Sequence, residues 1–159
     1  TSVLQGVLAP MVKDDVNWIN AGVLAKERGI TVTESTSPEA DHFVNLIKAT
    51  VFSDETATVS GTIYGKSDPR IVKINHFGLE LIPVGHLALI YNSDKPGAIG
   101  SIGTTLGKHG VNIARMSVGQ DEDGENNIIF MKTDTSIPEK VIKELCGLPM
   151  VKTVTPLEF

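Results

Sequence analysis

The sequence predicts an α+β protein in which an α/β domain with a mostly antiparallel sheet precedes a ferredoxin-like βαββαβ domain. Three observations predict this fold. Strand-like runs follow one another over residues 43–75 with only short turns between them. After residue 85, two helical patterns alternate with four strand patterns in the order of the ferredoxin-like arrangement. The stretch PVG at residues 83–85 separates the two parts, so we expect domains at residues 1–83 and 84–159.

The first forty residues predict one helix among short extended segments. Asp14 or Asp15 caps this helix, and Gly29 is a typical helix stop. Four apolar residues are expected to share one helix face, namely Val16, Ile19, Val23 and Leu24. The expected segments around it are a short strand or irregular apolar start at 3–10, an alternating strand at 30–36 and a turn at 37–41.

An antiparallel meander is predicted next. Its strands are expected at residues 43–52, 57–65 and 69–75, with one shorter strand at 77–82. The breaks SDET and KSDP between the strands read as turns.

The last part of the chain has the clearest pattern. The expected elements are strands at 86–92, 111–120, 126–134 and 150–159, and helices at 97–109 and from Ser136 to Gly147. Ile99, Ile102 and Leu106 share one face of the first helix. Ser136 with Glu139 three residues later has the pattern of a capping box. DEDGE between two of the strands predicts a hairpin tip.

Composition and charge exclude several classes of protein. The chain has 159 residues, 41% hydrophobic and 21% charged, as is ordinary for a globular protein. A net charge of −5 without a cluster of Lys and Arg argues against nucleic acid as a partner. No apolar run approaches the ~20 residues of a membrane span and no signal peptide is recognised, so no membrane contact is expected. The single cysteine, Cys146, excludes an internal disulfide framework and favours the reducing cytoplasm.

Most candidate motifs do not predict chemistry. GAIGSIG has the spacing G-x-x-G-x-x-G, and no acidic residue ends a second parallel strand, so it is not a dinucleotide fingerprint. The four histidines have no ligand spacing, so we predict no metal site and expect surface or hydrogen-bonded histidines. Cys146 lies near the end of a helix and is expected to fill apolar space. We predict no catalytic residue.

The stretch IYNSDKPGAIG has two interpretations. In one, Asp94 caps the following helix and Asn92 closes the turn. In the other, the same groups hold a free amino acid. Unpaired N–H groups near Gly97 and Ala98, at the helix N-terminus, would bind its α-carboxylate. Asp94 would then bind its α-ammonium together with an amide oxygen.

Longer stretches carry a resemblance to a known family. NSDKPGAIGSIGTTLGKHGVNIARMSVGQ resembles an ACT domain, a regulatory module that binds amino acids, through its D-K-P-G and G-V-N-I elements. NAGVLAKERGITVTES, SGTIYGKSDPRIVKIN and VGHLALIYNSDKPG resemble the intervening and ACT domains of long-form D-3-phosphoglycerate dehydrogenases, which use NAD and begin serine synthesis. The chain begins with Thr1 rather than Met, and we expect it to be a piece of a longer protein. The resemblance implies that the catalytic domain and its NAD precede Thr1, that this fragment has no cofactor or dehydrogenase activity, and that it senses L-serine.

The resemblance also implies a set of effector-binding residues. The loop part of this set is Asn92, Asp94, Pro96, Gly97 and Ala98, and Asn112 of G-V-N-I completes it. Asn92 departs from the histidine or tyrosine of other members. The loop lies at one end of a helix that spans ~20 Å, and Asn112 follows the other end of that helix. One serine therefore cannot reach both in one subunit, so the site is expected between two ACT domains of a homodimer or tetramer.

An anion site is a further implication of the resemblance. Arg70 and Lys132 stand where some relatives place cations that bind a phosphorylated substrate. Glu80 stands where another basic residue is expected, and its charge would repel a phosphate. The alternative is that Arg70 and Lys132 are ordinary surface charges.

Three other functions remain open. The chain could regulate another enzyme of amino-acid metabolism through a different amino acid. It could be an oligomerising module that binds no amino acid. It could be a small enzyme, although the sequence offers neither a nucleophile nor a metal site for one.

Overall fold

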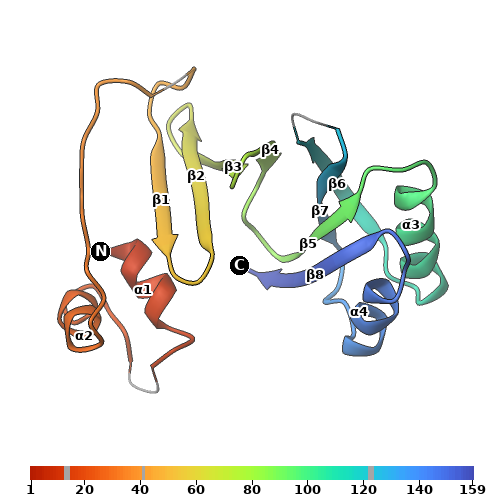
Figure 1. Ribbon diagram of the computed structural model, residues 1–159, viewed down its shortest axis with the longest axis horizontal. Helices are drawn as coiled ribbons and strands as arrows, with labels where there is room; N and C mark the ends of the chain where they lie inside the picture. Colours follow the sequence, from red (N-terminus) through yellow and green to blue (C-terminus); the bar gives the residue numbers. More distant parts are fainter. Residues whose placement is uncertain (13–14, 41, 122–123) are drawn as a thin grey trace. The chain divides into compact units, whose positions relative to one another are not determined.

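A computed structural model describes residues 1–12, 15–40, 42–121 and 124–159 (Figure 1). The chain forms two compact units, residues 1–41 and 42–159. The domain boundary at residues 83–84 stays a prediction.

The first unit is built from two short helices, α1 (Ser2–Leu8) and α2 (Ala21–Glu27). The strand or irregular start expected at residues 3–10 is wrong. Leu4 and Leu8 lie four residues apart and bring one helix face to the small core of this unit, where Leu8 is fully buried. The other buried members of this core are Val16, Ala21 and Ala25.

Helix α2 begins later than predicted. Asn17 and Asn20 form a turn of reciprocal bonds, because the Asn17 amide donates to Asn20 Oδ1 at 2.8 Å and the Asn20 amide donates to Asn17 Oδ1 at 3.1 Å. This local competition with helical hydrogen bonding delays the helix to Ala21. Ile19 is 92% exposed and Val23 is also exposed, so neither lies on the buried face. The alternative cap Asp14 lies outside the described residues. Gly29 follows the helix with φ +71°, as expected of a helix stop.

The strand expected at residues 30–36 is also wrong, because the chain there has no regular structure. Its alternation of apolar and polar residues is real, but none of the described strands pairs with it, and an unpaired strand is not stable. Residues 37–40 bend, with the Glu39 amide donating to Ser37 Oγ at 3.1 Å, while position 41 of the predicted turn lies outside the described residues.

The second unit begins with the predicted antiparallel meander. Its strands are β1 (Ile47–Phe52), β2 (Thr56–Tyr64), β3 (Asp68–Ile74) and β4 (Phe77–Leu81), hydrogen-bonded in that order. The first strand starts four residues later than predicted. Asn45 bends the chain before it, since the hydroxyl of Thr62 donates to Asn45 O at 2.6 Å and the Ile63 amide donates to Asn45 Oδ1 at 3.0 Å.

The ferredoxin-like domain is confirmed. Its elements are β5 (His86–Ser93), α3 (Ala98–Lys108), β6 (Ile113–Gln120), β7 (Asn126–Thr133), α4 (Glu139–Cys146) and β8 (Val151–Glu158). The strand order is β6-β7-β5-β8, all antiparallel, as this fold requires. The predicted capping box is wrong, because Pro138 is the N-cap of α4 and no side chain caps it. Of the predicted hairpin tip, residues 122–123 lie outside the described residues.

The two faces of this sheet are both buried. One face packs against α3 and α4, through residues that include Ala88, Ile90, Ile129 and Met131 on the strands and Ile102, Leu106, Val141 and Leu145 on the helices (Figure 1). Ile99 is 42% exposed and lies outside this core, contrary to expectation. The other face contributes Leu87, Ile128 and Phe130 to a second core with Ile74, Phe77 and Leu81 of the meander. The meander and the ferredoxin-like domain therefore share one core.

Strands β4 and β6 approach each other closely at two glycines. A Cβ atom added to Gly119 would lie 2.4 Å from the carbonyl oxygen of Gly78. Only a residue without a side chain fits at position 119, which brings the last meander strand against the edge strand of the second sheet.

Candidate functional site

Asp94 is held through its main-chain amide and through both oxygens of its carboxylate. The Asp94 amide donates to the Glu125 carbonyl oxygen at 2.9 Å. Its Oδ1 accepts a hydrogen bond of 3.0 Å from Asn127 Nδ2 at the start of β7, and its Oδ2 accepts one from Gln120 Nε2 at the end of β6. Both side-chain donors are neutral amides, which orient the carboxylate without cancelling its charge. Among the ion pairs of the described ranges, none involves Asp94. In the described ranges, the two oxygens of Asp94 are therefore held in place by neutral groups alone.

The N-terminus of α3 follows Asp94 closely in the chain. Its N-cap is Gly97, with φ +91°, and no side chain caps the helix. Asp94 therefore does not cap α3, contrary to the first interpretation of the loop. The first helix turn contains no acidic residue. The Ala98 amide donates to the Lys95 carbonyl oxygen at 3.1 Å, so it is not unpaired as predicted. The amides that follow it in the first helix turn have no partner within the helix, and this end of α3 carries a partial positive charge that favours an anion.

Asn92 lies in β5, within the strand predicted at residues 86–92. It is 0% exposed and lies directly opposite Asn127 in the β5–β7 ladder. Its Nδ2 donates to the carbonyl oxygen of Ser93 at 3.0 Å. Asn92 therefore belongs to the end of the sheet, next to the group that holds Asp94.

Asn112 lies at the far end of α3. The helix has 11 residues and rises ~16 Å along its axis. The Asn112 amide donates to Asp134 Oδ1 at 3.2 Å, and the residue is exposed. The structure thus brings Asn92, Asp94 and the residues 96–98 together and leaves Asn112 remote from them.

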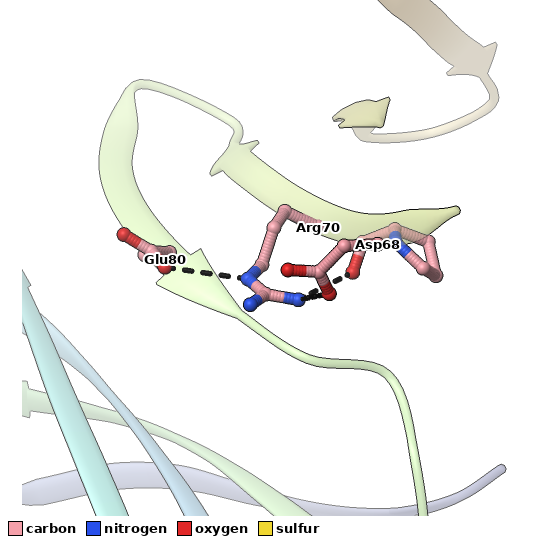
Figure 2. Close-up of polar contacts among 4 residues, drawn as sticks. Asp68, Arg70 and Glu80 are labelled. Atoms are coloured by element: carbon pink, nitrogen blue, oxygen red, sulfur yellow. Dashed lines mark hydrogen bonds and ion pairs between the residues drawn. The ribbon is translucent and has the colours of Figure 1, made fainter. Parts of the chain in front are cut away.

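Arg70 of the predicted anion site is engaged by two carboxylates (Figure 2). Its Nε lies 3.3 Å from Glu80 Oε1, and its terminal nitrogen pairs with Asp68. Desolvation lowers the pKa of Arg70, but hydrogen bonds and charge attraction from Asp68 and Glu80 outweigh this and raise it. The guanidinium charge is thus balanced within the chain.

Lys132, the second residue of the predicted anion site, lines a small cavity together with Glu80. A small cavity of ≈ 130 Å³ is lined by Lys132, Arg115, Ser117 and Glu80, with three apolar residues, Leu81, Ile82 and Phe130. Arg70 does not line this cavity. Glu80 is the residue common to both groups, and sequence reasoning missed Arg115.

Sequence reasoning also missed Gln120 and Asn127. Both lie next to the DEDGE hairpin, far in sequence from Asp94. The only available signal was the antiparallel order of the strands, which places the start of the strand after the hairpin beside the end of the strand that carries Asn92.

The remaining candidates lie on the surface. Cys146 is exposed and does not fill apolar space, because it follows the buried Leu145 on α4 and faces away from the core. His109 Nε2 lies 2.7 Å from Glu144, and His86 Nδ1 lies 3.4 Å from Glu158. In the described ranges, no group of three or more His, Cys, Asp or Glu could hold a metal ion. No described helix is long and apolar enough to cross a membrane.

Comparisons with known proteins identify two domains. The family model of the D-3-phosphoglycerate dehydrogenase intervening domain matches residues 1–75, and that of the ACT domain matches residues 86–149. A D-3-phosphoglycerate dehydrogenase of Bacillus subtilis (strain 168) is 39% identical over 159 residues, which are 99% of this chain and 30% of the relative. The protein of the same name from Methanocaldococcus jannaschii is 37% identical over 157 residues, 98% of this chain and 30% of the relative. The chain thus spans about 30% of the length of these relatives.

Proposed function

The chain belongs to the regulatory modules of D-3-phosphoglycerate dehydrogenases, and from this premise we propose that it binds L-serine where two ACT domains meet, for feedback inhibition. The observation that carries the proposal is the Asp94 carboxylate, which two neutral amides orient and no described cation neutralises. Such a group next to an uncapped helix N-terminus matches the two opposite charges of a free amino acid.

The proposed binding mode assigns roles to Asp94 and to the helix start within the effector loop, defined as residues 92–98, and to Asn112. The α-ammonium of L-serine binds the Asp94 carboxylate, which retains acceptor capacity beside its two amide donors. The α-carboxylate binds the amides that follow Ala98 at the start of α3, because the Ala98 amide itself donates to the Lys95 carbonyl oxygen at 3.1 Å. Asn112 of the partner subunit's α3 end contributes the amide that binds the serine hydroxyl.

A shared site gives a direct mechanism of regulation. Because the loop and Asn112 lie at opposite ends of α3, the full set of contacts exists only when two ACT domains pair. L-serine therefore favours the paired state by its differential affinity for it. Coupling of this kind to a distant active site is ~1–3 kcal/mol.

The proposal extends to the parent protein. The chain is a regulatory part without dehydrogenase activity of its own, and NAD binds to a catalytic domain outside it. The parent enzyme works in the cytoplasm as a homodimer or tetramer. The alternatives are an ACT module that regulates another enzyme with a different amino acid, and an oligomerising module without a ligand.

Thermal unfolding with each of the twenty amino acids tests the proposal. A ligand at 100 times its Kd stabilises the native state by ~2.7 kcal/mol, which is visible as a rise in Tm. We expect a rise with L-serine that is smaller in Asp94→Asn and in Asn112→Ala at the same ligand concentration. A rise with another amino acid only would favour the first alternative, and no rise with any would favour the second.

A further inference from the structure

Asn75, in the two-residue turn between β3 and β4, has an unusual backbone conformation. Its φ is +52°, and within the described ranges it is the only residue other than glycine with a positive φ. Asparagine enters this region more readily than most residue types, yet the conformation is still uncommon. Such a conformation persists only where the surrounding contacts hold the residue in place, and it is frequent at functional sites. Specific contacts must therefore hold Asn75 in this turn.

Three hydrogen bonds hold Asn75. Its backbone amide donates to the Thr58 carbonyl oxygen at 2.7 Å, and its Oδ1 accepts from the Thr58 amide at 2.9 Å. Its Nδ2 donates to the hydroxyl oxygen of Tyr91 at 3.3 Å. Because the Thr58 amide can only donate, the side-chain oxygen of Asn75 must face β2 and its nitrogen must face Tyr91. The turn thus directs one donor toward β5.

The bond to Tyr91 joins the two domains. Asn75 ends the match to the intervening domain, whereas Tyr91 lies within the match to the ACT domain. Among the side-chain hydrogen bonds of the described ranges, no other connects the meander with the ferredoxin-like domain. The Tyr91 ring also meets the Phe77 ring edge to face, with centroids 5.8 Å apart. Burial raises the pKa of Tyr91 more than the hydrogen bond from Asn75 lowers it, so the hydroxyl stays neutral near pH 7.

Tyr91 lies where the pairing of β5 with β8 is interrupted. Tyr91 pairs with Thr153, but the next residue, Asn92, pairs with Val151, so the register shifts between them. Such a bulge disrupts the ladder locally and increases the twist of the strand. Because side chains alternate along a strand, Tyr91 packs toward the meander while Asn92 lies on the opposite face. Asp94 follows directly after this end of β5, so the anchoring of Tyr91 sets the direction in which the chain enters the effector loop.

We propose that Asn75 is a positioning residue for the effector loop and acts through Tyr91. The bond between them, which we call the Asn75–Tyr91 link, holds the end of β5 in the direction in which two amides orient the Asp94 carboxylate. An amino acid that binds Asp94 in this orientation favours the link, and the link in turn favours binding, since coupling of this kind is reciprocal. This role rests on the proposed amino-acid site, and it gives the contact through which occupancy of that site reaches the meander.

Titration calorimetry of the 159-residue chain with L-serine tests this role. Tyr91→Phe removes only the hydroxyl, and Asn75→Gly removes the side chain while it still permits the positive φ. Each should raise the Kd about fivefold, as the loss of one neutral hydrogen bond predicts. The double variant should bind no more weakly than Asn75→Gly, because both changes remove the same bond. A purely structural role would lower the Tm without changing the Kd.

Two controls accompany these variants. Asn75→Asp keeps an acceptor for the Thr58 amide, and its second oxygen accepts from the Tyr91 hydroxyl, so this variant should keep the parental Kd. Tyr64→Phe removes the hydroxyl of an exposed tyrosine in β2 and should also leave the Kd unchanged. A parental Kd in both Tyr91→Phe and Asn75→Gly would overturn the proposed role.

Hydrogen exchange measured by NMR without ligand gives a second readout. The amides of Ser93 and Asp94 are hydrogen-bonded at 2.8 and 2.9 Å and report on the end of β5. In Tyr91→Phe and Asn75→Gly, both amides should exchange about fivefold faster, because the link no longer restrains local opening. The amide of Gly85, just before the other end of β5, should exchange as in the parent chain.

The two measurements distinguish failure of this role from failure of the L-serine site. Faster exchange at the end of β5 in a chain that binds no amino acid would contradict the L-serine site but support the link. Unchanged exchange of both amides in Tyr91→Phe and Asn75→Gly would overturn the proposed role, whether or not L-serine binds.

Discussion

Asn127 Nδ2 donates a hydrogen bond of 3.0 Å to Oδ1 of Asp94, so a buried amide at the start of β7 fixes the carboxylate of the effector loop. Gln120 Nε2 binds the other oxygen from the end of β6. The orientation of Asp94 is therefore determined by two strands that do not belong to the loop. Changes at these distant positions should affect ligand binding without touching the ligand.

Removing either amide should weaken L-serine binding. Because a hydrogen bond to a charged group contributes ~1.5–3 kcal/mol, Asn127→Ala and Gln120→Ala should each raise the Kd roughly tenfold, as measured by titration calorimetry. Gln120 is exposed, so its variant should keep the stability of the parent chain. Unchanged Kd values in both variants would show that the clamp on Asp94 has no part in binding.

Removing the charge of Asp94 should have a larger effect. Asp94→Asn keeps the shape of the side chain but loses the attraction for an ammonium, so we expect the Kd for L-serine to rise roughly 10- to 100-fold. Asp54→Asn, in an exposed turn, is the matched control and should bind normally. Circular dichroism checks the fold of both, and loss of fold in Asp94→Asn alone would assign this residue a structural role.

Asn112 should act through assembly. Asn112→Ala is expected to weaken L-serine binding and ligand-enhanced dimerisation together, because this residue completes the site from the other subunit. Sedimentation velocity with and without L-serine measures the effect. Lys108→Ala changes an exposed side chain at the same end of α3 and should leave it intact. Tight binding of L-serine by a strict monomer would contradict the shared site.

The contact between Gly119 and Gly78 should tolerate no side chain at position 119. Gly119→Ala places a Cβ 2.4 Å from the Gly78 carbonyl oxygen and should lower the free energy of unfolding by about 1–3 kcal/mol. Gly78→Ala is the matched control, since nothing lies within 4 Å of its added Cβ. Urea unfolding compares the two, and equal stabilities would mean that the strands separate at no cost.

Glu80 should suppress anion binding in its neighbourhood. Glu80→Gln removes a carboxylate that lies 3.3 Å from Arg70 and also lines the cavity with Lys132 and Arg115. We therefore expect inorganic phosphate to bind more tightly to this variant than to the parent chain in calorimetry at low salt. The surface variant Glu139→Gln should show no such gain. Equal phosphate binding in all three proteins would favour the interpretation of Arg70 and Lys132 as ordinary surface charges.

The sequence correctly predicted strands in segments that have a partner strand. It wrongly predicted a strand in a segment that has the same pattern but no described partner. The runs that became β1 to β8 each have a partner strand in one of the two sheets. Residues 30–36 alternate between apolar and polar residues, but no strand in the described part of the chain pairs with them. Residues 3–10 were too short for periodicity alone to distinguish Leu4 and Leu8 on a helix from an extended apolar run.

The candidate site was predictable only in its local part. Asp94 and Gly97 are neighbours in sequence, and the turn and helix signals place them together. Gln120 and Asn127 reach Asp94 through strand register, which depends on the exact pairing of β5, β6 and β7. The burial of Asn92 has the same origin, since it lies opposite Asn127 at the end of the ladder.

The core between the meander and the second sheet has a consequence for how such proteins can be rearranged. Phe77 and Leu81 pack with Leu87 and Phe130, so the helix-free face of the ACT sheet is covered by residues that precede it in the chain. Grafting the ACT domain alone onto another enzyme would leave this face bare and prone to aggregation. A recombinant protein with a functional sensor must therefore contain the meander as well as the ACT domain. The segment that has to move between proteins is larger than the ligand-binding domain.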